Sequence, residues 1–227
     1  MHELTLSGVE MRYRGLDGPA LQIPALYLPA GDMLTVTGPS GSGKSTLVNL
    51  LTGLERPCSG RILWDDTDIA ALGEAARDRW RGRHVGLIMQ DFHLFPGLSA
   101  LDNILLPARL ARVADAALMA RAHDLLEQVD LSRPNQRIET MSRGEMQRVA
   151  VARALLRCPG IIIADEPTAS LDAENGAAIA DLLVELAYQG GATLIAVSHD
   201  PVLIDRLPRR LALAAGRIVA DSQAEAA

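Results

Sequence analysis

The stretch Gly38-Pro-Ser-Gly-Ser-Gly-Lys-Ser45 decides how this chain folds. It fits the pattern G-x-x-x-x-G-K-[ST], in which a glycine-rich turn lets successive backbone N–H groups converge on phosphate oxygens. The apolar run Met33–Thr37 precedes it, and the helical pattern Ser45–Thr52, ended by Gly53, follows it. This order of strand, turn and helix predicts a phosphate-binding loop, with the anion held at the N-terminus of the helix.

The side chains of the loop suit the phosphates of a nucleotide together with Mg²⁺. Lys44 reaches the outer phosphates, and Ser45 offers a hydroxyl to the metal ion. The other residues expected to contact the nucleotide are Gly38, Pro39, Ser40, Gly41, Ser42, Gly43 and Thr46.

A second buried strand, Ile161–Ala164, ends in two adjacent carboxylates, Asp165 and Glu166. In open α/β sheets, ligands bind at the carboxyl ends of the strands. Adjacent side chains point in different directions, so the two carboxylates take different roles. We expect Asp165 to hold Mg²⁺ and Glu166 to orient and deprotonate the attacking water. With the phosphate-binding loop, this strand predicts attack of water on a bound phosphate group.

The remaining periodicity predicts an α/β fold with a mainly parallel sheet, because buried strands alternate with helices. An antiparallel β element is expected at the N-terminus, where Leu4–Met11 and Leu21–Leu28 flank the turn 15–19. Further strands are predicted at Arg61–Trp64, Val85–Met89 and Thr193–Val197, and helices at Arg143–Leu156 and Ala173–Tyr188.

A single domain of residues 1–227 accounts for this pattern. Residues 99–156 are mostly helical in pattern and too long for a simple crossover, so we expect a helical lobe (91–156) inserted into a nucleotide-binding core (1–90 and 157–220). The tail 220–227 is expected to fray.

Composition narrows the class of protein. The chain has 227 residues, 48% of them hydrophobic, which suffices for a large core. A net charge of −6 and 3% aromatic residues argue against a nucleic-acid partner. Cys58 and Cys158 lack disulfide or zinc spacing and are expected to be reduced and mostly buried. No apolar run reaches the roughly 18 residues that span a bilayer, and the N-terminus is not a signal peptide. We therefore expect a cytoplasmic chain that is not inserted into the membrane.

Further short motifs, in a fixed order along the chain, carry a resemblance to a known family. Met141–Glu145, Met-Ser-Arg-Gly-Glu, resembles the signature Leu-Ser-Gly-Gly-Gln of the ATP-binding-cassette (ABC) ATPases, the nucleotide-binding subunits of ABC transporters. Gln90 resembles their Q-loop glutamine, Ser170-Leu-Asp172 their D-loop, and His199 their switch histidine. Tyr13 resembles the aromatic residue that stacks on adenine. The likeness covers nearly the whole chain.

The resemblance implies a partner for the signature helix. In the family, two cassettes pack head to tail around two ATP molecules, so Ser142 and Gly144 of one copy face the γ-phosphate held by the other, with Asp172 nearby. The first turn of this helix has unpaired N–H groups and a dipole that favours an anion. A capping box between Ser142 and Glu145 is compatible with that role.

The resemblance also implies the remaining catalytic assignments. Glu166, His199, Gln90 and Lys44 carry hydrolysis, and Gln90 joins Ser45 and Asp165 around Mg²⁺. Two positions depart from the family pattern. Arg143 replaces a glycine, which the backbone tolerates because φ is negative on the first turn of a helix, and Glu145 replaces a glutamine.

The segment 90–107 is most similar to ATPases of lipoprotein-releasing and macrolide-exporter systems. Phe92, Leu94 and Phe95, with Pro96, are either a docking surface for the permease or core of the lobe. The function implied is a homodimer that drives an integral membrane permease for export or lipoprotein extraction, held on the cytoplasmic face of the membrane. An amino-acid importer and a soluble cassette ATPase, such as an iron–sulfur assembly factor, are alternatives.

Overall fold

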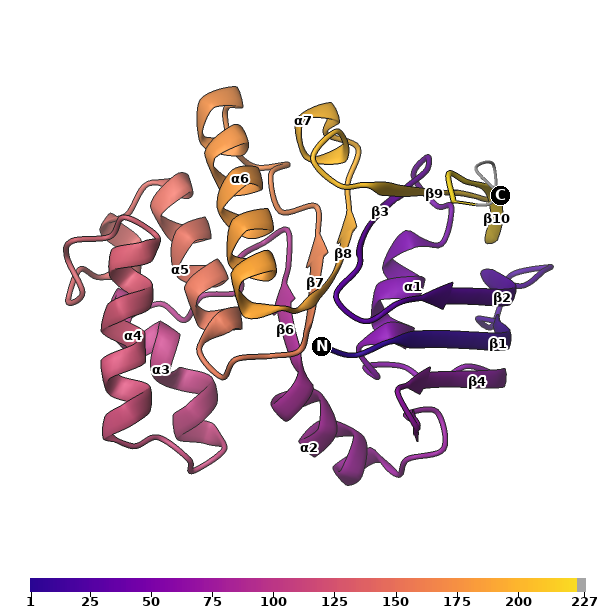
Figure 1. The fold of residues 1–227 in the computed structure, drawn as a ribbon, viewed down its shortest axis with the longest axis horizontal. Helices are drawn as coiled ribbons and strands as arrows, with labels where there is room; N and C mark the ends of the chain where they lie inside the picture. The colour runs from indigo at the N-terminus through magenta and orange to yellow at the C-terminus, as the bar shows by residue number, and fades with distance from the viewer. Residues whose placement is uncertain (224–227) are drawn as a thin grey trace.

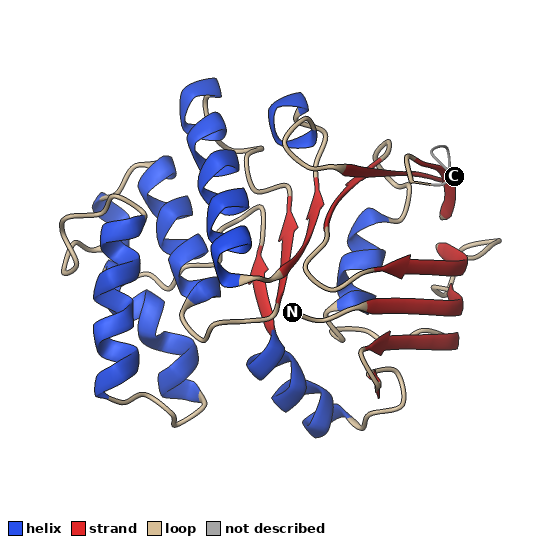
Figure 2. Ribbon diagram, viewed as in Figure 1, coloured by secondary structure: helices blue, strands red, loops and turns tan. Residues whose placement is uncertain are grey.

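The computed structural model of the chain describes residues 1–223 and contains two sheets with helices packed around them (Figures 1 and 2). The larger sheet has six strands in the order β10-β9-β3-β8-β7-β6. Strands β9, β3, β8, β7 and β6 are mutually parallel, and β10 pairs antiparallel with β9. Their bounds are β3 Met33–Thr37, β6 Val85–Ile88, β7 Ile161–Asp165, β8 Thr193–Val197, β9 Arg209–Ala214 and β10 Arg217–Asp221. The predicted α/β fold with a mainly parallel sheet is confirmed.

The smaller sheet is antiparallel and has the order β2-β1-β4-β5. It consists of β1 Leu4–Met11, β2 Leu21–Leu28, β4 Ser59–Trp64 and β5 Thr67–Asp68. The N-terminal antiparallel element predicted from the sequence is therefore present. The predicted strand at 61–64 belongs to this sheet. Its first residues are exposed and its last ones alternate, as expected for a strand with one face in water.

Helix α1 (Lys44–Leu51) packs between the two sheets and fixes the end of the phosphate-binding loop (Figure 1). Its buried side chains belong to one apolar core with residues of both sheets, among them Leu4 of β1 and Ile163 of β7. Helix α2 (Glu74–His84), which the sequence did not predict, leads directly into β6. Its polar and arginine-rich sequence has little apolar periodicity to reveal it.

The remaining helices gather on the other side of the parallel sheet, with α3 to α6 at the left of Figure 1 and α7 at its top, next to α6. They are α3 Ala100–Leu110, α4 Ala116–Gln128, the short 3₁₀ helix η1 Ile138–Thr140, α5 Arg143–Leu155, α6 Ala173–Gly190 and α7 Pro201–Ile204. Helix α5 contacts α3, α4, α6 and β6. It therefore connects the helical region with the sheet through one continuous apolar core, which includes Ile104, Val149 and Ile162.

Two expectations from the sequence were wrong. The tail was expected to fray from residue 220, but Ala220 and Asp221 belong to β10, where Arg209 binds both carboxylate oxygens of Asp221 at 3.0 and 2.7 Å. Residues 224–227 of that expected tail lie outside the described residues. Cys58 and Cys158 were expected to be mostly buried, and both are exposed. Each lies in a connection just outside a regular element, where side chains reach the surface.

Within residues 1–223, no helix has both the length and the apolar character needed to cross a bilayer.

Candidate active site

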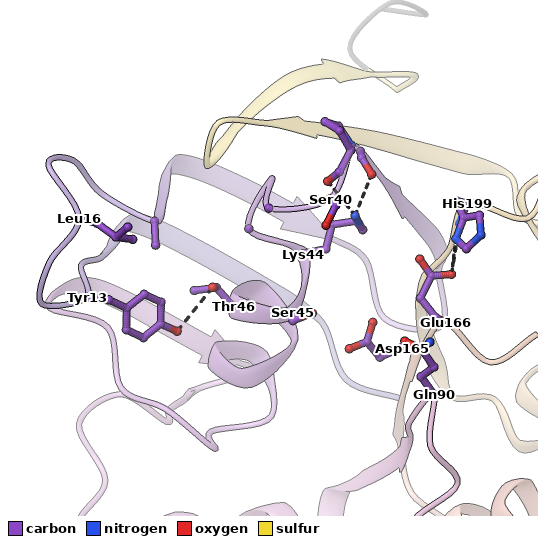
Figure 3. A pocket seen from close by; sticks show the side chains of 15 residues that line it. Tyr13, Leu16, Ser40, Lys44, Ser45, Thr46, Gln90, Asp165, Glu166 and His199 are labelled. Carbon is purple, nitrogen blue, oxygen red and sulfur yellow. Dashed lines mark hydrogen bonds and ion pairs between the residues drawn. The ribbon is translucent and has the colours of Figure 1, made fainter. Parts of the chain in front are cut away.

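A pocket of about 740 Å³ opens where the phosphate-binding loop meets the carboxyl ends of β3 and β7 (Figure 3). It brings together residues from five separate parts of the chain. Its lining consists of Tyr13, Leu16, Ala20, Gly38, Pro39, Ser40, Gly41, Gly43, Lys44, Ser45, Thr46, Gln90, Asp165, Glu166 and His199. Leu16 and Ala20, in the loop between β1 and β2, are the two members that sequence reasoning did not predict.

The loop from Gly38 to Gly43 needs glycine at two positions for reasons of space and backbone conformation. Gly38 has φ +150°, and a β-carbon there would lie 2.2 Å from the carbonyl oxygen of Leu213. Gly43 has φ +100°, and a β-carbon there would lie 2.8 Å from the carbonyl oxygen of Ala20. The loop is thus pressed against β9 and the β1–β2 connection, which leaves its other side open to the pocket.

Lys44 is folded back over the loop. Its Nζ donates to the carbonyl oxygens of Gly38 at 2.7 Å and Pro39 at 3.0 Å. An ammonium group has three donors, so one remains for a phosphate oxygen. The neighbouring Ser42 is buried, and its hydroxyl has no partner within the described residues.

Asp165 ends β7 beside Ser45 and Lys44. Burial raises the pKa of the Asp165 carboxyl, and the nearby Glu166 charge raises it further, while Lys44 and the Ser45 hydroxyl act in the opposite direction. A divalent cation at this point would favour the charged form.

The oxygen groups on this side of the pocket suit Mg²⁺. Ser45, Asp165 and Gln90 offer a hydroxyl, a carboxylate and an amide oxygen, the hard ligands that Mg²⁺ prefers. In residues 1–223 there is no cluster of three or more His, Cys, Asp or Glu side chains able to hold a metal by themselves. A site of this composition therefore fits Mg²⁺ bound together with substrate phosphates.

Glu166 follows the end of β7 in a left-handed conformation, with φ +48°. Its N–H donates to the carbonyl oxygen of Val197 at 2.8 Å, which holds this turn against β8. Its Oε2 lies 2.8 Å from Nδ1 of His199. The Glu166 side chain is 14% exposed and that of His199 is 73% exposed. A non-glycine residue in this conformation is strained, and such strain is concentrated at functional sites.

Three further residues hold the turn after Glu166, and sequence reasoning missed them. Gln147 of α5 is completely buried and donates from Nε2 to the carbonyl oxygen of Pro167 at 2.7 Å. Thr168 donates to Asp200 Oδ2 at 2.7 Å. A polar residue on the apolar face of a helix was the available signal for Gln147.

Tyr13 stands at the rim of the pocket, on the side of the antiparallel sheet (Figure 3). Its hydroxyl contacts Thr46 at 3.5 Å and donates to Glu55 at 2.5 Å. Burial and the hydrogen bond to Glu55 raise the pKa of Tyr13. These contacts fix the ring beside the loop, with 36% of the residue exposed.

Four predicted site residues, Ser42, Ser142, Gly144 and Asp172, do not line this pocket. Ser142 caps α5: its Oγ accepts from the Glu145 N–H at 3.3 Å, and its own N–H donates to Glu145 Oε2 at 2.8 Å. The predicted capping box is therefore present. Asp172 caps α6 in the same way, by accepting from the Asn175 N–H. The two helix N-termini face the same edge of the molecule as the end of β7 (Figure 1).

A comparison with models of protein families identifies the family to which the chain belongs. Residues 21–169 match the family model described as ABC transporter. The chain belongs to the ABC transporter ATPases.

Individual relatives are similar to this cassette in sequence or structure over almost its full length. It is 43% identical over 220 residues to the lipoprotein-releasing system ATP-binding protein LolD of Anaeromyxobacter dehalogenans, which covers 95% of this chain and 92% of the relative. The cassette MJ0796, solved as a dimer in a post-hydrolysis state with ADP and Pi, superposes with a TM-score of 0.87 at 32% identity, covering 96% of this chain and 97% of that one. CbiO1 of Clostridium perfringens, part of the cbiONQ transporter complex, superposes with a TM-score of 0.85 at 27% identity, covering 96% and 87%.

The cassette is thus an ATP hydrolase of the ABC type, as the sequence predicted. Its fold gathers the loop, both carboxylates, Gln90, His199 and Tyr13 into one pocket. It leaves the N-termini of α5 and α6, capped by Ser142 and Asp172, at the same edge but outside that pocket.

Proposed function

We propose that this cassette works as a head-to-tail dimer in which each ATP lies between the pocket of one copy and the signature of the other. The observation that carries the proposal is the separation just described: the helix N-terminus at Ser142 is suited to an anion, yet the pocket of the same chain does not include it. In this proposal the core 1–90 and 157–220 holds the nucleotide, and the lobe 91–156 brings the signature to the partner. The similar cassette MJ0796 was solved as a dimer, which supports a dimeric state for this chain.

The proposed chemistry divides the pocket residues by role. Lys44 and the loop N–H groups bind the phosphates, and Tyr13 stacks on the adenine. Glu166 accepts a proton from the attacking water, and His199, 2.8 Å from its carboxylate, holds that carboxylate in position. Ser45, Asp165 and Gln90 would hold Mg²⁺, which when bound neutralises charge on the phosphate oxygens. Ser142, Gly144 and Asp172 complete the partner's site.

A groove on a different face of the cassette is a suitable docking site for a permease. It has a volume of about 840 Å³ and runs between α2 and the C-terminal end of α3. Leu110 and Val113 on one side are 73% and 43% exposed, and the opposite rim carries Arg79, Arg81 and Arg83. In a chain with a net charge of −6, this rim favours an acidic, amphipathic segment of the permease.

The groove is connected to the nucleotide pocket through one side chain. Arg153, which lines the groove, donates from both terminal nitrogens to the carbonyl oxygens of Phe92 and His93 at 2.6 Å. Phe92 and His93 follow Gln90 and both have positive φ. A partner seated in the groove therefore acts next to the segment that carries Gln90, which would couple docking to hydrolysis.

The transport substrate we propose is a lipoprotein that the permease releases from the membrane, because a LolD protein is 43% identical to this chain. The cassette would then sit on the cytoplasmic face of the membrane, held there by the permease. An amino-acid importer or an iron–sulfur assembly ATPase would share the same pocket, so the identity of the membrane protein that co-purifies in detergent separates these functions.

The test of the proposed dimer is the dependence of ATPase activity on protein concentration. Because each site needs a second copy, the specific rate of the isolated chain should rise with concentration and approach a plateau as dimers form. A constant specific rate in a chain shown to be monomeric at every concentration would contradict the proposal.

A further inference from the structure

The N-termini of α5 and α6 meet at one side chain, Asn175. It occupies the third position of α6, whose N-cap is Asp172. Its backbone N–H donates to Asp172 Oδ1 at 2.9 Å, and its side-chain Nδ2 donates to Asp172 Oδ2 at 2.8 Å. Asn175 is therefore held to a single carboxylate by two hydrogen bonds, one from its backbone and one from its side-chain amide.

These contacts determine which way the amide of Asn175 points. A carboxylate only accepts hydrogen bonds, so the NH₂ end of the amide must face Asp172. The carbonyl end then faces α5. There, a β-carbon placed on Gly144 would lie 2.7 Å from Oδ1 of Asn175 and 3.1 Å from its Cγ. The carbonyl dipole also lies beside the N-terminus of α5, where negative partial charge is favoured.

We propose that Asn175 is a positioning residue that locks the signature helix α5 to the N-terminus of α6, and that Gly144 is glycine because the amide of Asn175 fills the space beside it. The lock fixes the distance between Ser142 and Asp172 within one chain. This inference rests on the proposed function, since both residues would meet the partner's nucleotide. Gly144 is buried and lies in a helix, so backbone conformation does not explain the need for glycine there.

The decisive test is a double-mutant cycle on Gly144 and Asn175, read out in two ways. The melting temperature of the isolated, nucleotide-free chain reports the contact within one chain. The kcat and KM for ATP, measured with the full complex, report its consequence for the shared site. Gly144→Ala should lower the melting temperature and reduce kcat/KM about tenfold or more, the range of coupling seen between residues in contact. Gly144→Ala combined with Asn175→Ala should recover most of the lost melting temperature and bring kcat/KM up to the value of Asn175→Ala alone, because the shorter side chain leaves room for the new methyl group.

Two further variants distinguish positioning by the hydrogen bond to Asp172 from a general effect of adding a methyl group to a buried glycine. Asn175→Asp keeps the shape of the side chain but cannot donate to Asp172, so it should raise KM for ATP about as much as Asn175→Ala does. Gly176→Ala is the matched control for adding a methyl group: Gly176 is a buried helical glycine whose nearest neighbour would be at 3.7 Å, and the change should be tolerated.

The outcomes distinguish failure of this inference from failure of the proposed dimer. If the double variant is no better than Gly144→Ala in either measurement, Asn175 does not determine the need for glycine and the inference is wrong. If Asn175→Asp behaves as the parent does, the hydrogen bond to Asp172 has no positioning role, which also overturns it. A third outcome is that the double variant recovers the melting temperature while KM for ATP is the same in all variants. The contact between Gly144 and Asn175 would then be confirmed, but its role in a site shared between copies would be contradicted.

Discussion

Oε2 of Glu166 lies 2.8 Å from Nδ1 of His199, although the two residues are contributed by the ends of different strands and one is far more exposed than the other. The backbone N–H of His199 also points at Oε2 of Glu166, at 3.4 Å. The Glu166 carboxylate is therefore held by His199, which follows β8. The backbone of Glu166 itself has a left-handed conformation. This arrangement suits a base whose position must be maintained through turnover.

Glu166→Gln should separate hydrolysis from binding. The amide keeps the shape of the side chain but cannot accept a proton from water, so turnover should fall by roughly two orders of magnitude or more, while ATP still binds. Gel filtration with Mg-ATP should then show an accumulated dimer. Lys44→Ala is the matched comparison, because it should weaken ATP binding itself. If Glu166→Gln hydrolyses ATP at nearly the parental rate, Glu166 is not the base.

Asp165→Asn should stabilise the nucleotide-free protein and weaken its response to Mg-ATP. The raised pKa of Asp165 means that its ionised form is disfavoured in the folded state, so the folded protein loses stability as pH rises through that pKa. Asp165→Asn should therefore melt at a higher temperature than the parent at pH 7, and this difference should disappear in acid. Thermal melts with and without Mg-ATP check this. Ligand at 100 times its Kd adds about 2.7 kcal/mol to the stability of the parent, and the variant should gain much less at the same concentrations.

Changes in the groove between α2 and α3 should uncouple transport from hydrolysis. Arg83→Glu reverses a charge on the rim, and Leu110→Ser removes an exposed apolar contact. Both should weaken co-purification with the permease and reduce transport by about tenfold, while the ATPase rate of the isolated chain stays unchanged. Arg61→Glu, on the exposed part of β4 and outside the groove, is the control. Normal coupling in both groove variants would place the docking site elsewhere.

Two of the residues that the sequence left open as docking surface or core, Leu94 and Phe95, differ in their surroundings. Leu94 packs against the core of the helical region, whereas Phe95 is 54% exposed. Polar replacement of Phe95 is therefore a test of docking, and polar replacement of Leu94 should instead lower the stability of the fold.

Arg143→Gly should change the ATPase rate of the full complex by less than about tenfold, or roughly 1.4 kcal/mol in the barrier. Arg143 is exposed on the first turn of α5 and has no positive φ, so arginine costs the backbone nothing. Its guanidinium adds positive charge near the proposed phosphate of the partner. Steady-state rates at saturating Mg-ATP decide the matter. A much larger rise would show that Arg143 restrains the enzyme, and a much larger fall that it supports the transition state directly.

Local patterns predicted most of the fold and of the pocket. The loop from Gly38 to Ser45 and the strand before Asp165 each carry their signal within a few residues, because glycine spacing and apolar runs are local properties. Asn175 carries no such signal, and Gln147 carries only that of a polar residue on an apolar helix face, because their roles depend on helix α5 meeting residues that follow β7. The same is true of β10, which pairs with β9 and is joined to it by the ion pair between Arg209 and Asp221.

The central claim, that each active site is built from two copies, is tested most directly by mixing two inactive variants. Lys44→Ala disables the pocket of a chain, and Ser142→Arg blocks its signature, so each variant alone should have little ATPase activity. Random pairing at equal amounts makes half of the dimers mixed, and each mixed dimer has one site with an intact pocket and an intact signature. The account predicts recovery up to about a quarter of the parental rate, well above either variant alone. No recovery on mixing, with subunit exchange confirmed, would contradict it.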